Sequence, residues 1–303
     1  MASFRAPLFK GMKTAVRPRI ALATYEHAPQ LAPDDQLLVP AFARIGIDAE
    51  PAVWSNDDVI WETFDGVLVR SCWDYHLRAG AFHAWLERLD ASRLPVWNSV
   101  ALLQWNAHKR YLLDLEQRGV AIVPTAVVAQ GDVPGVRHVI EESGWTRVVI
   151  KPAVSASGFE THVIDPANDP AAWPIVERVA ATGDVLVQPF AEEIPRDGEY
   201  SLMFIDGGFS HGAIKRAAAH EFRVQTEHGG SVDLIEISDD LIEQGANVLA
   251  ALPETPVYAR VDGIVRDGRL LLMELELIEP NLFLELQPGA DTRLAEAVAR
   301  RLD

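Results

Sequence analysis

Tyr258-Ala-Arg-Val-Asp-Gly-Ile-Val265, followed by Arg269-Leu-Leu-Leu-Met-Glu-Leu-Glu276, is the stretch that decides the fold of this sequence. Apolar residues fill most positions of both runs, and a short turn joins them, as expected for a β-hairpin. Three carboxylates interrupt the apolar pattern. Side chains at i and i+2 share one face of a strand, so Glu274 and Glu276 point the same way. Asp262 on the other arm can reach that face as well.

Carboxylates that face each other inside an apolar sheet are costly unless a cation binds between them. Oxygen ligands of this kind suit Mg²⁺, which proteins usually hold with one or two carboxylates plus the phosphates of a nucleotide. We therefore take Asp262, Glu274 and Glu276 as candidate metal ligands. The hairpin alone is also compatible with a strand pair that turns a solvated acidic face outward.

The composition predicts a globular protein and argues against several classes of function. The chain has 303 residues, 49% of them hydrophobic, which allows two or three domains. Its net charge of −17 argues against sequence-independent nucleic-acid binding and means that an anionic ligand needs local cations. No apolar run is long enough for a membrane span. The single cysteine, Cys72, excludes an intrachain disulfide and favours a reducing, cytoplasmic setting.

The first 18 residues differ from the rest in being basic without any acid. They carry Arg5, Lys10, Lys13 and Arg17, and they lack the apolar core and cleavage site of a signal peptide. We expect a disordered leader over residues 1–18.

Strands and helices alternate between residues 19 and 105, which is typical of a parallel sheet covered by helices. The expected strands are 19–24, 49–54, 66–70 and 94–98. One helix is expected over 79–89, and another is expected to be capped by Asp34 and Asp35 and to run to about Ile45. Ligands of such sheets bind beyond the carboxyl ends of the strands. One of these ends carries the candidate substrate residues Arg70, Trp73, Asp74 and Tyr75.

Two further units are expected after residue 105. Residues 106–187 predict a small α+β lid domain with a helix over about 107–118, strands at 125–128, 147–151, 160–164 and 184–188, and helices near 136–142 and 172–181. Residues 188–303 predict an antiparallel sheet of strands 199–205, 209–215, 257–265 and 269–276, covered by helices near 239–252 and 290–302.

Two short segments have the composition of ligand-binding loops. Lys151, at a strand end, runs into Pro-Ala-Val-Ser-Ala-Ser-Gly158, whose small residues let backbone N–H groups approach an anion. Gln188-Pro-Phe-Ala191 lies between two inferred domains and offers the amide and backbone groups that an adenine edge requires. A surface turn and an ordinary linker are the alternatives.

Taken in order, these pieces resemble the ATP-grasp superfamily over residues 19–303. The strongest likeness is Arg260-Val-Asp262 followed by Glu274-Leu-Glu276, which is similar to the metal-binding strands of D-alanine–D-alanine ligases. Those ligases hold two Mg²⁺ ions through an Asp and a Glu-x-Asn pair, and Glu276 stands where asparagine is usual. The resemblance implies an N-terminal parallel α/β domain, a small lid domain and a C-terminal antiparallel-sheet domain that carries the metals.

The middle of the chain resembles prokaryotic glutathione synthetase, and this likeness implies a role for each matching residue. Adenine would be bound by Gln188, Pro189, Phe190 and Ala191, and the ribose by Glu199. The phosphates would be bound by Lys109 and Lys151, beneath a loop containing Ser155, Ser157 and Gly158. The catalytic cations would be Lys215, Arg223 and Arg260. For any one of these cations, a surface salt bridge is the alternative.

A narrower resemblance, in residues 70–75 and 274–284, is to the cyclo-ligases that close the cycloserine ring from O-ureido-serine. The resemblances imply an ADP-forming ligase that uses ATP and Mg²⁺ to make a C–N bond on an amino-acid-like or peptide-like small molecule. A phosphorylated carboxylate or ureido group would be the intermediate. A small-molecule kinase and a non-catalytic ATP-binding module are the alternatives. Relatives are often dimers or tetramers, so self-association is compatible with the resemblance.

Overall fold

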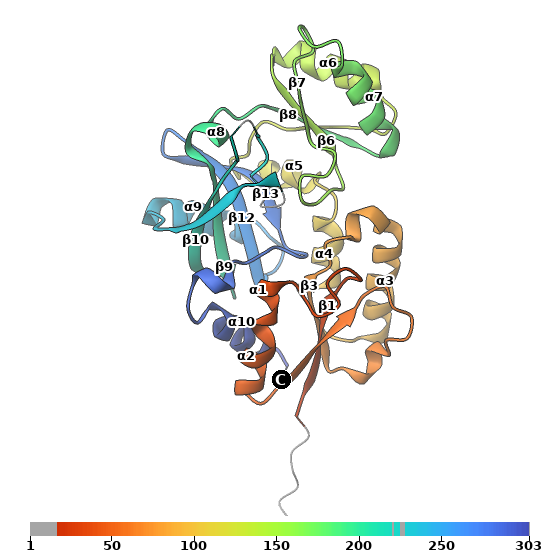
Figure 1. The fold of residues 1–303 in the computed structure, drawn as a ribbon, viewed down its shortest axis with the longest axis vertical. Helices are drawn as coiled ribbons and strands as arrows, with labels where there is room; N and C mark the ends of the chain where they lie inside the picture. Colours follow the sequence, from red (N-terminus) through yellow and green to blue (C-terminus); the bar gives the residue numbers. More distant parts are fainter. Residues whose placement is uncertain (1–16, 220, 225–227, 303) are drawn as a thin grey trace, which may run out of the picture.

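The structure is a computed structural model that describes residues 17–219, 221–224 and 228–302. Its chain forms three sheets in three lobes, shown from red to blue along the sequence in Figure 1. The expected leader lies outside the described residues except for its last two positions. None of the helices in the described ranges is long and apolar enough to cross a membrane.

The N-terminal lobe contains a parallel sheet, as predicted, with strand order β2-β1-β3-β4. Its strands are β1 (Arg19–Thr24), β2 (Asp48–Val53), β3 (Gly66–Ser71) and β4 (Val96–Trp97). Alternate residues of β3 face opposite sides: Leu68 packs with α2 (Leu38–Arg44), and Val67 and Val69 pack with α3 (Ala79–Ser92). Every residue of β3 is buried, because helices cover both faces.

The helix expected to begin at Asp34 is divided into α1 (Pro33–Gln36) and α2, and its two aspartates do not cap it. The N-cap is Ala32, which makes no side-chain capping bond. Asp34 and Asp35 are buried instead, and Asp35 accepts hydrogen bonds from Arg70 and Ser71. The expectation of an acidic cap was wrong because the carboxylates form tertiary contacts.

The single helix expected over residues 107–118 is also interrupted. The structure has α4 (Val100–Asn106), capped by the Ser99 hydroxyl, and then α5 (Tyr111–Gln117). Between them the backbone N–H of Lys109 donates to the carbonyl of Ala153 at 2.8 Å, in the loop that follows the lid strand β6 (Val148–Pro152). This break in the helix brings Lys109 beside the loop that follows Lys151.

The lid, at the top of Figure 1, is an antiparallel sheet with strand order β5-β8-β6-β7. Its other strands are β5 (Ala126–Val128), β7 (His162–Ile164) and β8 (Val185–Pro189). Helices α6 (Val133–Ser143) and α7 (Ala172–Thr182) pack on it through a separate apolar core that includes Val136, Val148 and Val176. Helix α5 does not join this core, because its Leu112 and Leu115 pack with the C-terminal sheet.

The C-terminal sheet has strand order β11-β10-β9-β12-β13 and is antiparallel. Its strands are β9 (Glu199–Ile205), β10 (Gly208–Arg216), β11 (Ser231–Ile235), β12 (Tyr258–Arg266) and β13 (Arg269–Glu276). Strand β11 was not predicted, because its short and partly exposed sequence at the sheet edge has no clear apolar face. Helix α9 (Asp239–Ala250) covers the face that contains Leu202 and Phe204.

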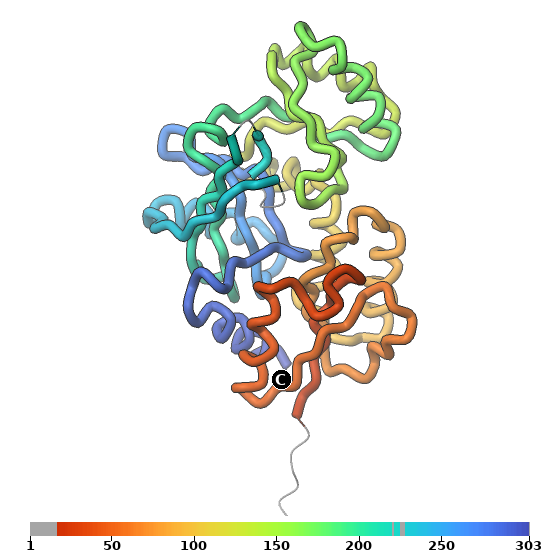
Figure 2. Tube along the Cα trace, viewed as in Figure 1, coloured from red at the N-terminus to blue at the C-terminus, as the bar shows by residue number. Residues whose placement is uncertain are grey.

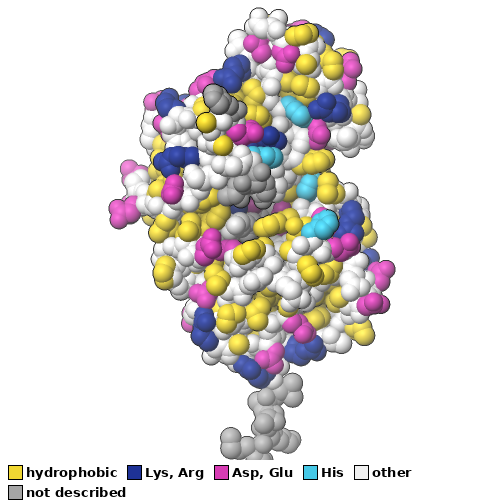
Figure 3. Space-filling model, viewed as in Figure 1, with side chains coloured by type: hydrophobic (Ala, Val, Ile, Leu, Met, Phe, Trp, Pro, Cys, Tyr) yellow, Lys and Arg dark blue, Asp and Glu magenta, His cyan; other side chains and the backbone are white. Residues whose placement is uncertain are grey.

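The last helix, α10 (Ala290–Ala299), returns to the beginning of the chain. Its Leu294 and Val298 share an apolar core with Leu38 and Phe42 of α2. Figure 2 shows the resulting contact between the blue and red ends of the trace. The N-terminal and C-terminal lobes are therefore packed together, and the lid projects from them. In Figure 3 the outline of the molecule is notched where the lid meets the N-terminal lobe.

Candidate active site

One pocket lies where the lid, the C-terminal sheet and the N-terminal lobe meet, and nearly all candidate residues line it. Two of the candidates, Arg70 and Asp74, do not. The candidates in its wall are Trp73, Tyr75, Lys109, Lys151, Ser155, Ser157, Gly158, Gln188, Pro189, Phe190, Ala191, Glu199, Lys215, Arg223, Arg260, Asp262, Glu274 and Glu276. The structure thus brings together residues from three sheets that are far apart in the sequence.

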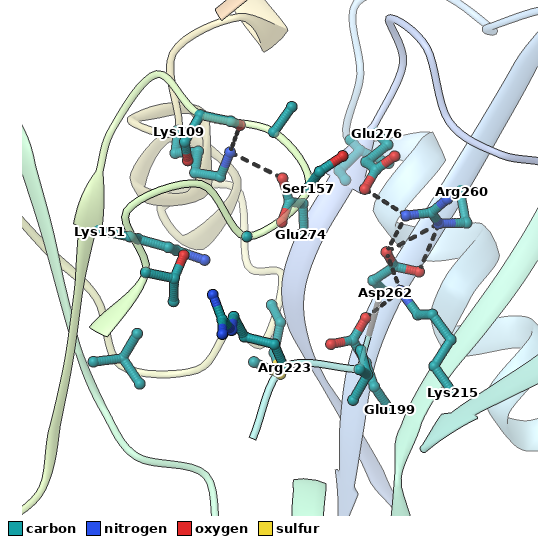
Figure 4. Close-up of a pocket in the computed structure, with 18 of the residues that line it drawn as sticks. Lys109, Lys151, Ser157, Glu199, Lys215, Arg223, Arg260, Asp262, Glu274 and Glu276 are labelled. Atoms are coloured by element: carbon teal, nitrogen blue, oxygen red, sulfur yellow. Dashed lines mark hydrogen bonds and ion pairs between the residues drawn. The ribbon is translucent and has the colours of Figure 1, made fainter. Parts of the chain in front are cut away.

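The hairpin β12–β13 forms the acidic wall, drawn on the right of Figure 4. Its register places Asp262 opposite Glu274 and Arg260 opposite Glu276. A bulge follows this pair, since Gly263 is opposite Leu272 and Met273 is the extra residue. As a result the neighbouring residues Met273 and Glu274 both line the pocket.

Asp262 is buried and held by three donors. Its carboxylate is 2.9 Å from the Lys215 ammonium, accepts from Arg260 Nε at 3.0 Å, and accepts from the Ser201 hydroxyl at 2.6 Å. Burial would raise the pKa of Asp262, but Arg260 and Lys215 outweigh it and lower the pKa to about 2. Lys215 also pairs with Glu199, and Arg260 pairs with Glu276.

Glu276 remains less well neutralised than Asp262. Burial raises its pKa to about 7 against the lowering effect of Arg260, and the neighbouring Asp262 and Glu274 raise it further. Glu279, just beyond the strand, has a pKa raised to about 8 by burial and by Glu276. Burial and the neighbouring carboxylates thus favour the protonated forms of Glu276 and Glu279, in contrast to Asp262.

Two lysines form the basic wall, drawn on the left of Figure 4. The Lys109 ammonium is 3.0 Å from Glu274 and also donates to the carbonyl of Ser155. Lys151 is only 8% exposed, and within the described residues its ammonium makes neither a hydrogen bond nor an ion pair. Burial lowers the pKa of Lys151. A buried ammonium without a partner, at the rim of a pocket, is suited to an anionic ligand.

The carboxylates offer the hard oxygen donors that Mg²⁺ requires, although the protein's own cations engage them. Asp262 binds Lys215 and Arg260, Glu274 binds Lys109, and Glu276 binds Arg260. Within the described ranges, no group of three Asp, Glu, His or Cys side chains is close enough together to hold a metal ion. Mg²⁺ would fit this donor set if these side chains turned away from the protein's cations, and it would relieve the crowding of carboxyl groups around Glu276.

The segment from Gln188 to Ala191 joins β8 to the C-terminal sheet and lines the pocket. The Gln188 amide donates to the Thr125 hydroxyl at 2.9 Å, and the Phe190 N–H donates to the Arg147 carbonyl. Apolar residues that were not predicted from the sequence also line the pocket. They are Val149, Ile194, Val224, Met273 and Leu275. Apolar residues that line a pocket cannot be told from core residues by their sequence pattern.

Arg223 lines the pocket from the segment that precedes β11. Its guanidinium is bound by Glu221 through two contacts of 3.1 and 2.8 Å. An anion that used Arg223 would compete with this carboxylate.

The end of β3 divides into residues that line the pocket and residues that support it. Trp73 and Tyr75 line the pocket. Arg70 is fully buried outside it, donating to Asp35 at 2.9 Å and to the carbonyl of Pro280 at 2.6 Å. Asp74 accepts from Trp54 and pairs with Arg78. The sequence predicts that Arg70 and Asp74 bind substrate together with Trp73 and Tyr75, but in the structure both residues contact other parts of the protein and neither lines the pocket.

Arg70→Met is expected to lower the free energy of unfolding by about 3–5 kcal/mol, because it leaves the Asp35 carboxylate buried without its cation. Denaturant titration of the two proteins measures this loss. The double variant Asp35→Asn/Arg70→Met should recover part of it. Unchanged stability together with a weaker substrate interaction would instead place Arg70 at the substrate.

Comparison with known proteins agrees with this geometry. Residues 115–285, more than half of the chain, match the family model of the prokaryotic glutathione synthetase ATP-grasp domain. The chain belongs to the ATP-grasp family. Residues 20–98 match the model of the N-terminal domain of D-cycloserine synthetase DcsG.

Individual relatives of this ATP-grasp chain extend the comparison to almost its full length. The cycloserine biosynthesis protein DcsG of Streptomyces lavendulae is 32% identical over 285 residues, which cover 88% of this chain and 92% of the relative. The crystal structure of D-cycloserine synthetase DcsG superposes with a TM-score of 0.85 at 30% identity, covering 94% of this chain and all of the other. D-alanine–D-alanine ligase of Bacillus anthracis shares the fold, with a TM-score of 0.68 at 15% identity and coverage of 94% and 97%.

These matches confirm the predicted ATP-grasp architecture and identify the chain as an ATP-dependent ligase. They also agree with the narrower resemblance to the enzymes of cycloserine formation. Ligases of this family use ATP and Mg²⁺, and the individual roles of the pocket residues in this chain remain predictions.

Proposed function

We propose that this ligase forms a C–N bond on a small amino-acid-like substrate, and that ring closure of O-ureido-serine is its reaction. The observation that carries the proposal is one pocket with Lys109 and Lys151 on one wall and Asp262, Glu274 and Glu276 on the other. Such a pair of walls suits a nucleotide whose phosphates need both cations and Mg²⁺. The similarity to DcsG supports the choice of substrate.

Lys151 is the group best prepared for the phosphates. Its ammonium is buried and has no partner in the described chain, so a phosphate oxygen would supply the missing acceptor. Lys109, whose present partner is Glu274, would bind a second phosphate once Glu274 turns away. We assign the adenine to the segment from Gln188 to Ala191, where Ile194 and Met273 supply apolar walls.

Asp262, Glu274 and Glu276 would hold Mg²⁺, which when bound neutralises the charge on the phosphates. For this to happen Glu274 must turn from Lys109, and Glu276 from Arg260. Lys109 and Arg260, which lose these partners, could then bind the anionic ligands together with Lys215. The same side chains would thus neutralise one another before binding and neutralise the ligands and Mg²⁺ after binding.

The chemistry needs two steps. A carboxylate oxygen of the substrate attacks the γ-phosphorus, and the bond from that phosphorus to ADP breaks. A nitrogen of the ureido group then attacks the acyl carbon, phosphate leaves, and the nitrogen loses a proton. Arg260 and Lys215, which line the pocket, would stabilise the negative charge that develops on the acyl oxygen and the phosphate. The loop containing Ser155, Ser157 and Gly158 would exclude water from the acyl phosphate.

An ADP-release assay with Mg²⁺, ATP and O-ureido-serine tests the proposal directly. We expect ADP to form in step with a cyclised product that mass spectrometry detects, and no ADP to form when Mg²⁺ is omitted. D-alanine and serine serve as comparison substrates in the same assay. Accumulation of a stable phosphorylated substrate without a cyclic product would show a kinase, and nucleotide binding without ADP formation would show a binding module.

A further inference from the structure

The segment that follows β13 is fixed by an unusual set of contacts. Residues 277–282, which we call the anchored segment, form neither helix nor strand, so their carbonyl groups need other partners. Each of the six consecutive carbonyl oxygens accepts a hydrogen bond from a different side chain. In chain order the donors are Asn98 (2.9 Å), Tyr258 (2.9 Å), Trp73 (3.1 Å), Arg70 (2.6 Å), Arg260 (2.9 Å) and His211 (2.9 Å).

These donors come from two lobes of the molecule. Asn98, Trp73 and Arg70 belong to the N-terminal lobe, while Tyr258, Arg260 and His211 belong to the C-terminal sheet. Fixing six peptide units in this way leaves the backbone of the anchored segment little freedom. The backbone of Glu279, near the middle of the segment, is therefore held in place, and its side chain lines the pocket.

The charge environment of Glu279 is incomplete. Within the described residues, its carboxylate forms no salt bridge with a Lys, Arg or His. Lys109 is the cation that acts on it, but the Lys109 ammonium is bound to Glu274 at 3.0 Å and to the Ser155 carbonyl. Trp73 and Tyr75 line the same pocket, and aromatic rings also favour a cationic group.

A buried glutamate that lacks a cation is held in its protonated form, and it becomes a carboxylate when a positive partner from outside the protein binds beside it. We propose that Glu279 binds the α-ammonium group of the substrate, and that the anchored segment positions it for this role. The inference rests on the proposed ligase function, since it assigns the substrate end of the same pocket. It predicts that the enzyme distinguishes an amino acid from a carboxylic acid that lacks the amino group.

Glu279→Gln tests the proposal, because it keeps the shape of the side chain and removes its charge. Glu285→Gln is the matched control, since Glu285 follows the anchored segment and is exposed. Calorimetry with Mg²⁺ and a non-hydrolysable ATP analogue measures the affinity for two probes, O-ureido-serine and its analogue without the α-amino group. We expect the unmodified protein and the control to prefer the amino probe about 10- to 100-fold.

In the Glu279→Gln variant this preference should disappear, while the affinity for the ATP analogue and its dependence on Mg²⁺ stay unchanged. A preference that survives in the variant, or that is absent from the unmodified protein, would overturn the proposal. So would a variant whose main defect is weaker Mg²⁺ binding, because Glu279 would then belong to the metal. The ADP-release assay fails independently if the proposed reaction is wrong, and the binding comparison still decides the role of Glu279.

Discussion

Replacing Glu274 by glutamine is expected to abolish ADP formation while leaving the chain folded. Glu274 faces Asp262 across the hairpin, and its side chain is partly exposed to the pocket. Glutamine can still accept the hydrogen bond from Lys109, so the local packing should survive. The negative charge that would hold Mg²⁺ against the phosphates is lost, and we expect turnover to fall by about 100- to 1,000-fold or more.

Three measurements separate this loss from a folding defect. Thermal unfolding should show a midpoint close to that of the unmodified protein, and ADP release should not recover as Mg²⁺ is raised into the millimolar range. Glu243→Gln, an exposed change on α9, is the matched control and should retain full activity. Normal ADP release by the Glu274→Gln variant would show that the metal assignment is wrong.

Lys151→Met is expected to weaken nucleotide binding severely without destabilising the protein. The Lys151 ammonium is buried and unpaired within the described chain, and burial lowers its pKa, so the folded protein gains nothing from the charge itself. An uncharged side chain of similar length should therefore leave the unfolding midpoint equal or higher. Loss of one charge-assisted hydrogen bond to a phosphate should weaken ATP binding about 10- to 100-fold.

Thermal unfolding with and without an ATP analogue measures both effects in one experiment, because the rise in midpoint that a ligand causes grows with the logarithm of its affinity. The nucleotide-dependent rise should shrink in the Lys151→Met variant and persist in Arg88→Met, an exposed change on α3. An unchanged rise in the Lys151 variant would remove this lysine from the phosphate site.

Much of the fold could be predicted because its strongest signals are local. Apolar runs of four to nine residues bounded by Gly, Asp or Pro correspond to β1, β3, β12 and β13, and their order along the chain matches the observed sheets. The acidic positions on the hairpin stood out because carboxylates are rare in such runs. Lys151 stood out because it ends a buried strand.

The remainder depends on contacts that no local pattern contains. The helix breaks at Lys109 because the backbone there bonds to Ala153, more than forty residues away in the sequence. The sequence around Arg70 does not show whether its guanidinium binds a ligand or donates to the carbonyl of Pro280, as it does in the structure. The anchored segment could not be predicted either, because its six donors come from two separate parts of the chain, residues 70–98 and 211–260.

The anchored segment also bears on how the enzyme moves. Its hydrogen bonds join the N-terminal and C-terminal lobes at the pocket, and the contact of α10 with α2 joins the same lobes at a second place. The lid has its own apolar core and joins this pair through the chain near α5 and β8. We therefore expect nucleotide exchange to involve a movement of the lid relative to the two joined lobes, while the backbone around Glu279 keeps its shape.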